Sequence, residues 1–321
     1  INKVPPALLM GNAVILKPAS VNPLTLTRYV ELLVEAGVPA GVISVVHGSG
    51  SVVGKTLTSS KKVDMVSLTG STAAGIDAAK NCADHCAHSS LELGGNDAFI
   101  LCADGDMDLA IEETVWGRLY NTGQVCCASK RFLVENSVKD EFIKKMTDKI
   151  NSLKQGNPQD MSTDIGCLVS EEAAIEVERQ VNETIAAGAT LVCGGKRNGA
   201  FYEPTILDNV TPDMEVAKDM EIFGPVIPVI GFDDLDEAIE IANKSIYGLS
   251  GSIITKDISK AIKVSEKMEC GGFVINGASF FRSFEQPFGG WKYSGIGNEG
   301  IMTTLKEMSR TKTVILKNIT K

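Results

Sequence analysis

The stretch Ser89-Ser-Leu-Glu-Leu-Gly-Gly-Asn-Asp-Ala-Phe-Ile-Leu-Cys102 decides the fold, because it holds two strand-like runs separated by a pair of glycines. Residues 89–93 predict one buried strand, and the continuous apolar run at residues 98–102 predicts the next. Gly94 and Gly95 interrupt the pattern between them, as turn residues do. We therefore expect one α/β unit to end near residue 94 and a second unit to begin at residue 95.

Strand-like and helical segments alternate on both sides of this stretch. Upstream, the predicted strands are 13–17, 42–46 and 63–69, and the predicted helices are 22–37, 48–60 and 71–84. Downstream, the predicted strands are 131–135, 190–193, 226–232 and 251–255, and the predicted helices are 106–120, 139–153, 170–187 and 235–244. Such alternation predicts parallel sheets of the doubly wound type. The predicted fold class is therefore α/β, with two doubly wound units.

The composition indicates a globular protein with an acidic balance of charge. Of the 321 residues, 44% are apolar and 22% are charged, which suits a chain with a hydrophobic core. The net charge of −9 and the pI of about 5.0 argue against nucleic acid or anionic lipid as a partner. No apolar run approaches the roughly 20 residues that cross a bilayer, so no membrane partner is expected. Eight cysteines without the spacing of a disulfide scaffold predict a cytoplasmic location.

Two adjacent thiols occupy an exposed type of position in Asn121-Thr-Gly-Gln-Val-Cys-Cys-Ala-Ser-Lys130. They follow a glycine-containing turn and precede a predicted strand. Main-chain N–H groups left unpaired at such a turn can stabilise an oxyanion and lower the pKa of a thiol. The alternative is that both cysteines are small buried hydrophobic residues. Glu92, on the predicted strand before Gly94, either caps a turn or faces a cleft.

Six motifs, in the same order along the chain, resemble the signature set of the NAD(P)-dependent aldehyde dehydrogenases. They are Gly11-Asn-Ala-Val-Ile-Leu-Lys-Pro-Ala19, Leu68-Thr-Gly-Ser-Thr72, Leu91-Glu-Leu-Gly-Gly95, Gly123-Gln-Val-Cys126, Glu221-Ile-Phe-Gly-Pro-Val226 and Pro287-Phe-Gly-Gly-Trp-Lys-Tyr-Ser-Gly295. The resemblance implies that Cys126 is the nucleophile and that Glu92, 34 residues earlier, is the general base. It implies oxidation of an aldehyde to a carboxylate through a thiohemiacetal and a thioester on Cys126.

The resemblance also assigns residues to an NAD or NADP cofactor. Lys17 is implied at the adenosine ribose, Glu221 at the nicotinamide ribose, and Phe223 beside the nicotinamide. Gly70 and Ser71 begin a predicted helix whose free N–H groups are expected to face the pyrophosphate; the alternative is an ordinary helix cap.

Ser20 departs from many NAD-preferring relatives, which carry glutamate at this position. A small neutral residue removes a carboxylate that would repel a 2′-phosphate, so we expect NADP to be accepted. The segment Cys82-Ala-Asp-His-Cys-Ala-His88 contains residue types that bind metals. It lacks the separated ligand pairs of a zinc module, so no metal is expected.

The segments around Cys126 look most similar to bacterial succinate-semialdehyde dehydrogenases. A substrate with a carboxylate at its far end requires a cation in the pocket. Arg282 is the first candidate, with Ser283 beside it and Phe288 in the following motif, and Arg118 is the second candidate. Tyr120 stands where some succinate-semialdehyde enzymes have an arginine, so that contact does not carry over.

Three other functions compete with this assignment. Lactaldehyde or another small aldehyde is the main alternative substrate. A CoA-acylating enzyme is disfavoured because such relatives generally lack the base at Glu92. A structural protein without activity is disfavoured because Cys126, Glu92 and Glu221 are all present.

By the resemblance, residues 1–94 form the C-terminal part of the NAD(P)-binding domain and residues 95–295 form the catalytic domain. Residues 296–321 form a return segment, with an oligomerisation strand at 312–317 that adds to a partner subunit in a homodimer or homotetramer. The family's oxyanion-hole asparagine lies upstream of the Lys17 motif. We therefore expect this sequence to be the C-terminal two-thirds of an enzyme, and to be inactive or unstable alone.

Overall fold

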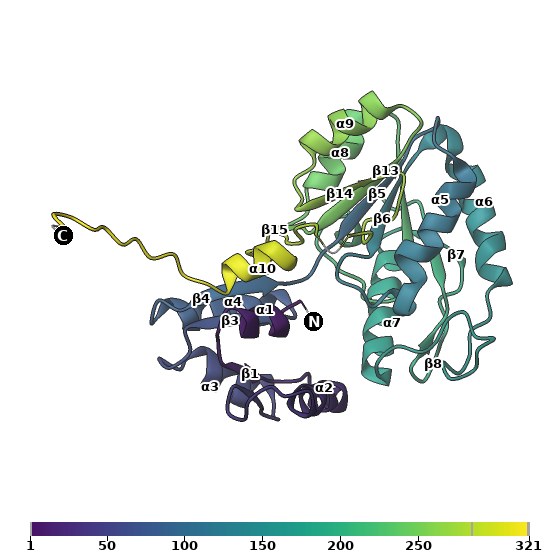
Figure 1. Ribbon diagram of the computed structural model, residues 1–321. Helices are drawn as coiled ribbons and strands as arrows, with labels where there is room; N and C mark the ends of the chain where they lie inside the picture. Colours follow the sequence, from purple (N-terminus) through teal and green to yellow (C-terminus); the bar gives the residue numbers. More distant parts are fainter. Residues whose placement is uncertain (1, 284, 320–321) are drawn as a thin grey trace.

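The structure, a computed structural model, describes residues 2–283 and 285–319. A smaller unit contains the first strands and the segment near the C-terminus, and a larger unit lies beside it (Figure 1). The outer bounds of the predicted domains, residues 1 and 321, lie outside the described residues. The predicted boundaries at 94 and 295 stay predictions.

The larger unit is organised around a seven-stranded sheet in the order β14-β13-β5-β6-β11-β10-β7. Neighbouring strands are parallel, except that β7 at one edge is antiparallel to β10. The strands are β5 (Asp97–Leu101), β6 (Ser129–Glu135), β7 (Thr190–Cys193), β10 (Thr205–Asp208), β11 (Val226–Phe232), β13 (Ser250–Ile254) and β14 (Gly272–Ile275).

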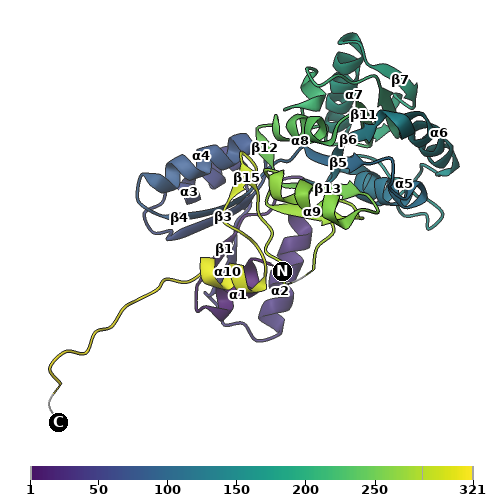
Figure 2. The same cartoon turned by 90° about the horizontal axis from the view of Figure 1, so that it is seen from above.

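Helices cover both faces of this sheet (Figures 1 and 2). They are α5 (Met107–Thr114), α6 (Asn136–Ser152), α7 (Glu171–Ala186), α8 (Leu235–Asn243) and α9 (Ile258–Lys267). Successive residues of β5 point to opposite faces, so Ala98 and Ile100 pack in one core with α7, α8 and α9. Phe99 and Leu101 pack in the other core with α5 and α6. Burial on both faces explains why β5 is apolar from Ala98 to Leu101.

The smaller unit contains two short parallel pairings. Strand β1 (Val14–Leu16) pairs with β2 (Ile43–Val45), and β3 (Met65–Thr69) pairs with β4 (His88–Glu92). Its helices are α1 (Val4–Leu9), α2 (Pro23–Glu35), α3 (Lys55–Thr58), which continues the π-helical turn η1 (Gly50–Gly54), and α4 (Thr72–Ala83). Helix α2 connects β1 to β2 and α4 connects β3 to β4, as the alternating pattern predicts. The predicted α/β class with doubly wound units is confirmed.

The segment near the C-terminus returns to the smaller unit. Strand β16 (Gly295–Ile296) is antiparallel to β4, and α10 (Ile301–Glu307) lies beside α1 (Figure 1). The side-chain amide of Asn12 donates a hydrogen bond to the carbonyl oxygen of Met308 at 2.8 Å. A further antiparallel pair, β12 (Tyr247–Gly248) with β15 (Trp291–Lys292), connects the larger unit to this returning segment.

Some elements differ from the sequence-based expectation. The helix predicted at 106–120 ends as α5 at Thr114 and continues as a π-helical turn, η2 (Val115–Leu119), and a 3₁₀ turn, η3 (Tyr120–Gly123). Elements without a counterpart in the prediction are α1, α9, α10, β10, β12, β14, β15, β16, the 3₁₀ turn η4 (Glu215–Ala217), and the hairpin β8 (Arg197–Asn198) with β9 (Phe201–Tyr202). Most of these are too short to produce a periodic pattern.

The predicted oligomerisation strand at 312–317 is not a strand within this chain. These residues extend away from the body, and Val314, Ile315 and Leu316 are 69%, 81% and 77% exposed (Figure 1). A strand needs a neighbour for its main-chain hydrogen bonds, and the extended tail reaches no sheet edge of its own chain. Its pairing with a partner subunit stays a prediction.

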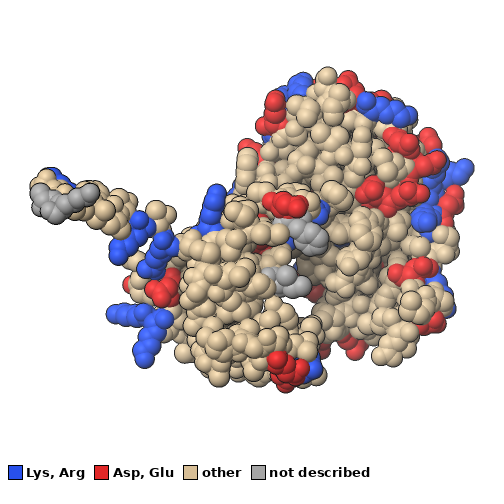
Figure 3. Space-filling view, in the orientation of Figure 1, with Lys and Arg blue, Asp and Glu red and all other residues tan. Residues whose placement is uncertain are grey.

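The surface carries charges of both signs. Acidic and basic side chains alternate along the outer edge of the larger unit in Figure 3, and the middle of the visible face carries few of them. In the described part of the chain, no helix is both long enough and apolar enough to cross a membrane.

Candidate functional site

Three of the motifs meet through close contacts between glycines and main-chain or carboxylate atoms. Gly123 has a φ of +75°, and a Cβ atom there would lie 2.3 Å from the carbonyl oxygen of Gly224. A Cβ atom on Gly95 would lie 2.8 Å from the carbonyl oxygen of Cys126. A Cβ atom on Gly94 would lie 2.4 Å from Oε2 of Glu221. These distances leave no space for a side chain, so glycine brings the thiol, base and cofactor motifs together.

The loop before Cys126 has a strained backbone that its own polar side chains hold. Asn121 and Thr122 have φ values of 49° and 56°, which non-glycine residues rarely adopt. The side-chain amide of Asn121 donates to the main-chain carbonyl oxygen of Gln124 at 3.1 Å. The side-chain amide of Gln124 donates to the main-chain carbonyl oxygen of Asn121 at 2.9 Å. The N–H of Val169 donates to Oε1 of Gln124 at 2.8 Å. Strain of this kind is common at functional sites.

The two adjacent thiols are not equivalent. Cys126 is partly exposed, whereas Cys127 is only 6% exposed. A hydrogen bond from the Cys127 thiol lowers the pKa of Cys126 to about 6; burial opposes this shift, and the charge of Lys130 assists it. The same hydrogen bond, with burial, raises the pKa of Cys127. Cys126 is therefore the member of the pair whose surroundings favour the thiolate.

Glu92 is the last residue of β4 and is 3% exposed. Neither of its carboxylate oxygens has a hydrogen-bond partner among the described residues. Burial, assisted by the nearby charges of Glu299 and Cys126 and opposed by those of Lys3 and Arg282, raises the pKa of Glu92 to about 8. A buried carboxyl group with these properties can take a proton near neutral pH.

Lys3 and Glu299 were not singled out from the sequence. Lys3 Nζ lies 3.1 Å from Glu299 Oε1. The charge of Glu299 raises the pKa of Glu92, and that of Lys3 lowers it. The two residues come from opposite ends of the chain, so their spacing along the sequence gives no signal. The Lys3 side chain is 28% exposed, so this ion pair extends to the surface.

Strand β4 is held on both sides at the position of Glu92. The N–H of Gly70 donates to the carbonyl oxygen of Glu92 at 3.1 Å, and Gly295 pairs with Glu92 across the sheet. The N–H of Leu93 donates to the carbonyl oxygen of Ser294 at 2.9 Å. The predicted pyrophosphate turn and the Pro287–Gly295 motif therefore both meet at the candidate base.

The predicted cofactor residues have chemistry that suits a nicotinamide dinucleotide. Lys17 Nζ donates to the carbonyl oxygens of Pro18 at 2.8 Å and Gly48 at 3.2 Å. Ser71 caps the 12-residue helix α4 by accepting a hydrogen bond from Ala74 N at 3.4 Å. The other N–H groups of the first turn can bind an anion. Ser20 is exposed.

Glu221 and Phe223 form the other candidate cofactor surface. The Glu221 carboxylate is 19% exposed and accepts a hydrogen bond from Gly95 N at 3.1 Å. The Phe223 ring is 42% exposed next to Lys130, whose Nζ lies 5.8 Å from the ring centroid. A carboxylate for ribose hydroxyls and an apolar ring for a flat heterocycle therefore adjoin the nucleophile loop.

The prediction that Arg118 contacts the substrate is wrong. Its side chain is 0% exposed and donates to the carbonyl oxygens of Val226 at 2.6 Å, Ile222 at 2.8 Å and Gly123 at 3.5 Å. Burial lowers the pKa of Arg118 to about 9. The guanidinium group joins the nucleophile loop to the Glu221 motif from inside the protein, where no substrate reaches it.

Arg282 lies at the opposite, exposed side of the site. Its guanidinium carbon lies 4.3 Å from the ring centroid of Phe288, which is 9% exposed. Phe288 belongs to a small apolar cluster with Cys127 and Leu249, against which Cys126 packs. Among the described residues no ion pair joins Arg282 to Glu285, so its charge is available to a ligand. Ser283 is exposed, and its N–H donates to Oε1 of Gln286 at 3.3 Å.

An aromatic cluster that the sequence reasoning missed lies near the same side. The ring centroids of Trp116, Tyr120 and Phe280 are 5.0 Å to 5.6 Å apart, and Phe280 packs on the cluster that contains Cys126. Trp116 and Tyr120 are about half exposed. Their spacing of four residues, which places side chains on one helix face, was the available signal.

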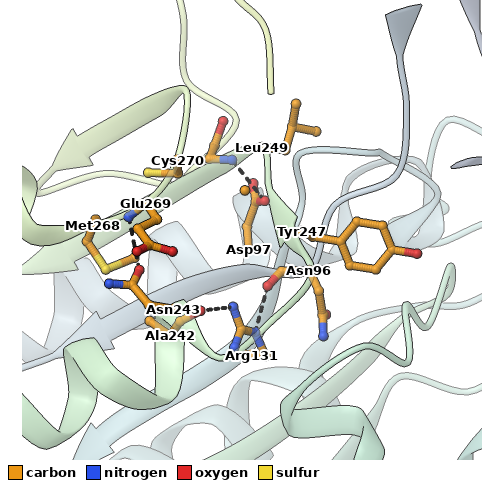
Figure 4. Close-up of a pocket in the computed structure, with 12 residues that line it drawn as sticks. Asn96, Asp97, Arg131, Ala242, Asn243, Tyr247, Leu249, Met268, Glu269 and Cys270 are labelled. Atoms are coloured by element: carbon orange, nitrogen blue, oxygen red, sulfur yellow. Dashed lines mark hydrogen bonds between the residues drawn. The ribbon is translucent and has the colours of Figure 1, made fainter. Parts of the chain in front are cut away.

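Behind the nucleophile loop lies a cavity of about 10 Å³ lined by Asn96, Asp97 and Arg131, among other residues (Figure 4). Arg131 donates to the carbonyl oxygens of Asn96 at 2.6 Å and Ala242 at 2.9 Å. Burial raises the pKa of Asp97 to about 8. The cavity is the size of a single water molecule, so it does not accept a substrate.

Metal ligands do not cluster in the described residues: no group of three or more His, Cys, Asp and Glu side chains is arranged to hold an ion. Within the cysteine-histidine segment, Cys82 is buried at the end of α4 and Cys86 is exposed beyond it.

Comparisons with known proteins agree with this arrangement. A sequence profile of the Aldehyde dehydrogenase family matches residues 1–314. The chain is 39% identical to the lactaldehyde dehydrogenase of Methanococcus aeolicus over 319 residues, which is 98% of this chain and 68% of that protein.

Two solved structures have the same fold. A betaine aldehyde dehydrogenase variant of Staphylococcus aureus in complex with NAD+ superposes with a TM-score of 0.93 and 38% identity, covering 100% of this chain and 66% of that one. The glyceraldehyde-3-phosphate dehydrogenase of Methanocaldococcus jannaschii complexed with NADP superposes with a TM-score of 0.93 and 38% identity. The match covers 99% of this chain and 69% of that one.

The chain thus spans about two thirds of the length of these proteins. These relatives are named for lactaldehyde, betaine aldehyde and glyceraldehyde 3-phosphate, so the finer likeness to succinate-semialdehyde dehydrogenases is not confirmed. The chain belongs to the aldehyde dehydrogenase family.

Proposed function

We propose that the protein oxidises a small aldehyde of the lactaldehyde class to its carboxylate with NAD(P)+. The observation that carries this proposal is the pairing of a thiol with a lowered pKa, Cys126, with a buried carboxyl group that has no partner, Glu92. A hydrolytic aldehyde dehydrogenase requires both groups, because one forms the acyl intermediate and the other activates the water that removes it.

The residues of this chain divide the reaction between them. The Cys126 thiolate attacks the aldehyde carbon, and the main-chain N–H groups of its loop stabilise the oxyanion that forms. The bound nicotinamide supplies the hydride acceptor. Glu92 then takes a proton from water, which attacks the thioester on Cys126 and releases the carboxylate. The pKa of about 8 for Glu92 keeps this base within reach of neutral pH.

The proton that Glu92 receives needs a way out of a buried site. We assign this proton route to Glu299 and Lys3. They form an ion pair of 3.1 Å, both charges shift the pKa of Glu92, and the ammonium group of Lys3 is partly exposed. In this proposal Glu299 accepts the proton from Glu92, directly or through water, and Lys3 stabilises the charge that Glu299 carries between turnovers.

The substrate class follows from the exposed side of the site. Phe288 and the Trp116, Tyr120 and Phe280 cluster suit a short apolar carbon chain, and Arg282 suits a hydroxyl or an anionic group at its far end. Two related proteins act on aldehydes with such ends, since one is named for lactaldehyde and one for glyceraldehyde 3-phosphate. A CoA-acylating reaction is less suited, because Glu92 is present to activate water.

The test is the steady-state oxidation of lactaldehyde, succinate semialdehyde and propanal by the full-length source protein, with NAD+ and NADP+ in separate assays. We expect substrate-dependent formation of the reduced cofactor, with the highest kcat/KM for lactaldehyde. Preference for succinate semialdehyde would return the substrate to the first prediction. No turnover of any aldehyde, with either cofactor, would contradict the proposal. The homo-oligomer and the cytoplasmic location stay predictions.

A further inference from the structure

Lys130 occupies a position that an ammonium group rarely takes. It is the second residue of β6, inside the seven-stranded sheet, and its side chain is 1% exposed. A buried lysine is strongly unfavourable unless charged or polar partners compensate for its lost hydration. Nothing in the sequence pattern singles out Lys130, because it adjoins Arg131 at the start of a predicted strand.

The partners of Lys130 belong to both halves of the site. Nζ donates to the carbonyl oxygen of Cys126 at 2.5 Å, reaching back over the turn that follows the nucleophile. Nζ also lies 3.2 Å from Oε1 of Glu221 and 5.8 Å from the ring centroid of Phe223. A single ammonium group therefore contacts the main chain of the nucleophile and two candidate cofactor residues.

The position of Glu221 depends on this contact. Its Oε1 atom accepts a hydrogen bond from Gly95 N at 3.1 Å and pairs with Lys130, so one oxygen is fixed from two directions. Among the described residues, Oε2 accepts no hydrogen bond. The geometry holds one carboxylate oxygen and leaves the other for a hydroxyl group of a ligand.

We propose that Lys130 is a positioning residue that sets the reactivity of Cys126 and the cofactor-binding geometry of Glu221 at the same time. The proposal rests on the proposed function. Its physical basis is that one buried positive charge stabilises the negative charge of a thiolate and of a carboxylate. Loss of this charge disfavours the Cys126 thiolate and also frees Glu221 to rotate away from the ribose.

Substitution of the two partners has opposite effects on Cys126, and this separates the proposal from simple damage. The charge of Lys130 lowers the pKa of Cys126, whereas that of Glu221 raises it. Lys130→Met should therefore slow alkylation of Cys126, and Glu221→Gln should accelerate it. Both variants should raise the KM for NAD(P)+. The other titratable groups that act on Cys126 are Cys127, Glu92 and Asp97, which both variants leave in place.

The experiment measures the rate at which iodoacetamide alkylates Cys126 in the full-length protein without cofactor, as a function of pH, by mass spectrometry of the modified peptide. In this reaction the thiolate displaces iodide and forms a carbon–sulfur bond. For Lys130→Met we expect an alkylation rate about tenfold lower at about pH 5, where the thiol is mostly protonated in both proteins, equivalent to one pKa unit, and equal rates above about pH 8. The KM for NAD(P)+ should rise at least about tenfold, with a smaller change in kcat.

Controls distinguish this role from a structural one. Lys130→Arg keeps the charge and should restore the alkylation profile; if Lys130→Met does not fold, Glu221→Gln tests the same coupling through the opposite shift. Lys139→Met removes another partly buried lysine, whose partner is Asp208 at 2.7 Å, and should change neither readout. A folded Lys130→Met with an unchanged alkylation profile, or an unchanged KM, overturns the proposal. Alkylation needs no aldehyde or cofactor, so failure of the proposed function would leave this readout intact.

Discussion

Two regions of the site hold their side chains in different ways. The nucleophile wall, which we define as Cys126 with Gly94, Gly95, Gly123 and Arg118, contains three glycines in close contact with main-chain oxygens or with the Glu221 carboxylate. A methyl group added at any of the three would overlap one of these atoms. The substrate mouth, defined as Trp116, Tyr120, Phe280, Arg282 and Ser283, consists largely of exposed side chains.

The difference indicates which region can vary. A change in the nucleophile wall displaces backbone that several motifs share, so it affects the chemistry for every substrate. A change in the substrate mouth alters one contact of one substrate. We therefore expect variants of the wall to reduce kcat or stability, and variants of the mouth to alter KM with the fold unchanged.

The largest effect is expected at the thiol pair. Cys126→Ser should abolish turnover, by at least about 10⁴-fold, because it removes the nucleophile. Cys127→Ala removes the thiol that donates to Cys126, so the rate near neutral pH should fall by about tenfold and recover at higher pH, where Cys126 ionises without help. Stopped-flow measurement of the first turnover checks both. Equal losses in the two variants would contradict the assignment of Cys126.

Glu92→Gln should stop the reaction after the first turnover. The hydride-transfer burst remains, because Cys126 still attacks the aldehyde, whereas steady-state turnover falls by about 10² to 10⁴-fold without the base. In the unmodified protein the steady-state rate should rise with pH through about 8, since Glu92 activates water only when it has lost its proton. A steady-state rate independent of pH between about 7 and 9 would remove Glu92 from this role.

The sequence predicted the strands of the wall better than the arrangement of its side chains. The apolar run at 98–102 became β5 (Asp97–Leu101), because its alternate residues fill two cores. Arg118 was misassigned, because its carbonyl partners at Ile222 and Val226 lie more than a hundred positions away in the chain. These residues come together only in the folded protein. Spacing along the sequence therefore cannot show that Arg118 is a buried residue that joins two segments.

One arginine from each region can be replaced to compare how firmly the two regions are held. Arg118→Met leaves three carbonyl oxygens without their donor inside the wall, so the free energy of unfolding should fall by about 3 kcal/mol. Arg282→Met in the mouth should change it by less than about 0.5 kcal/mol, because this side chain is exposed. Urea titration of the two variants provides the measurement. Similar losses would show that the regions are not held differently.

For Arg282→Met the effect should fall on substrate recognition. The KM for an aldehyde with an anionic end, such as succinate semialdehyde, should rise about tenfold or more, while that for the shorter, neutral propanal stays within about twofold. The reason is that only the anionic end gains a charge-assisted hydrogen bond from the guanidinium group. Lys139→Met, on α6, serves as a matched control for loss of a positive charge. Equal changes for both aldehydes would remove Arg282 from the substrate contact.

The smallest effect is expected at the far end of the cofactor site, where Ser20 is exposed beyond both regions. With serine present, NADP+ should be used with a kcat/KM within tenfold of that for NAD+, because no carboxylate repels the 2′-phosphate. Ser20→Glu should lower the kcat/KM for NADP+ by about tenfold, the effect of placing one negative charge near another across partly exposed space. It should leave the alkylation rate of Cys126 unchanged, since Ser20 lies in the smaller unit and acts on none of the groups around the thiol. A tenfold preference of the unmodified protein for NAD+ would show that something other than this side chain decides between the cofactors.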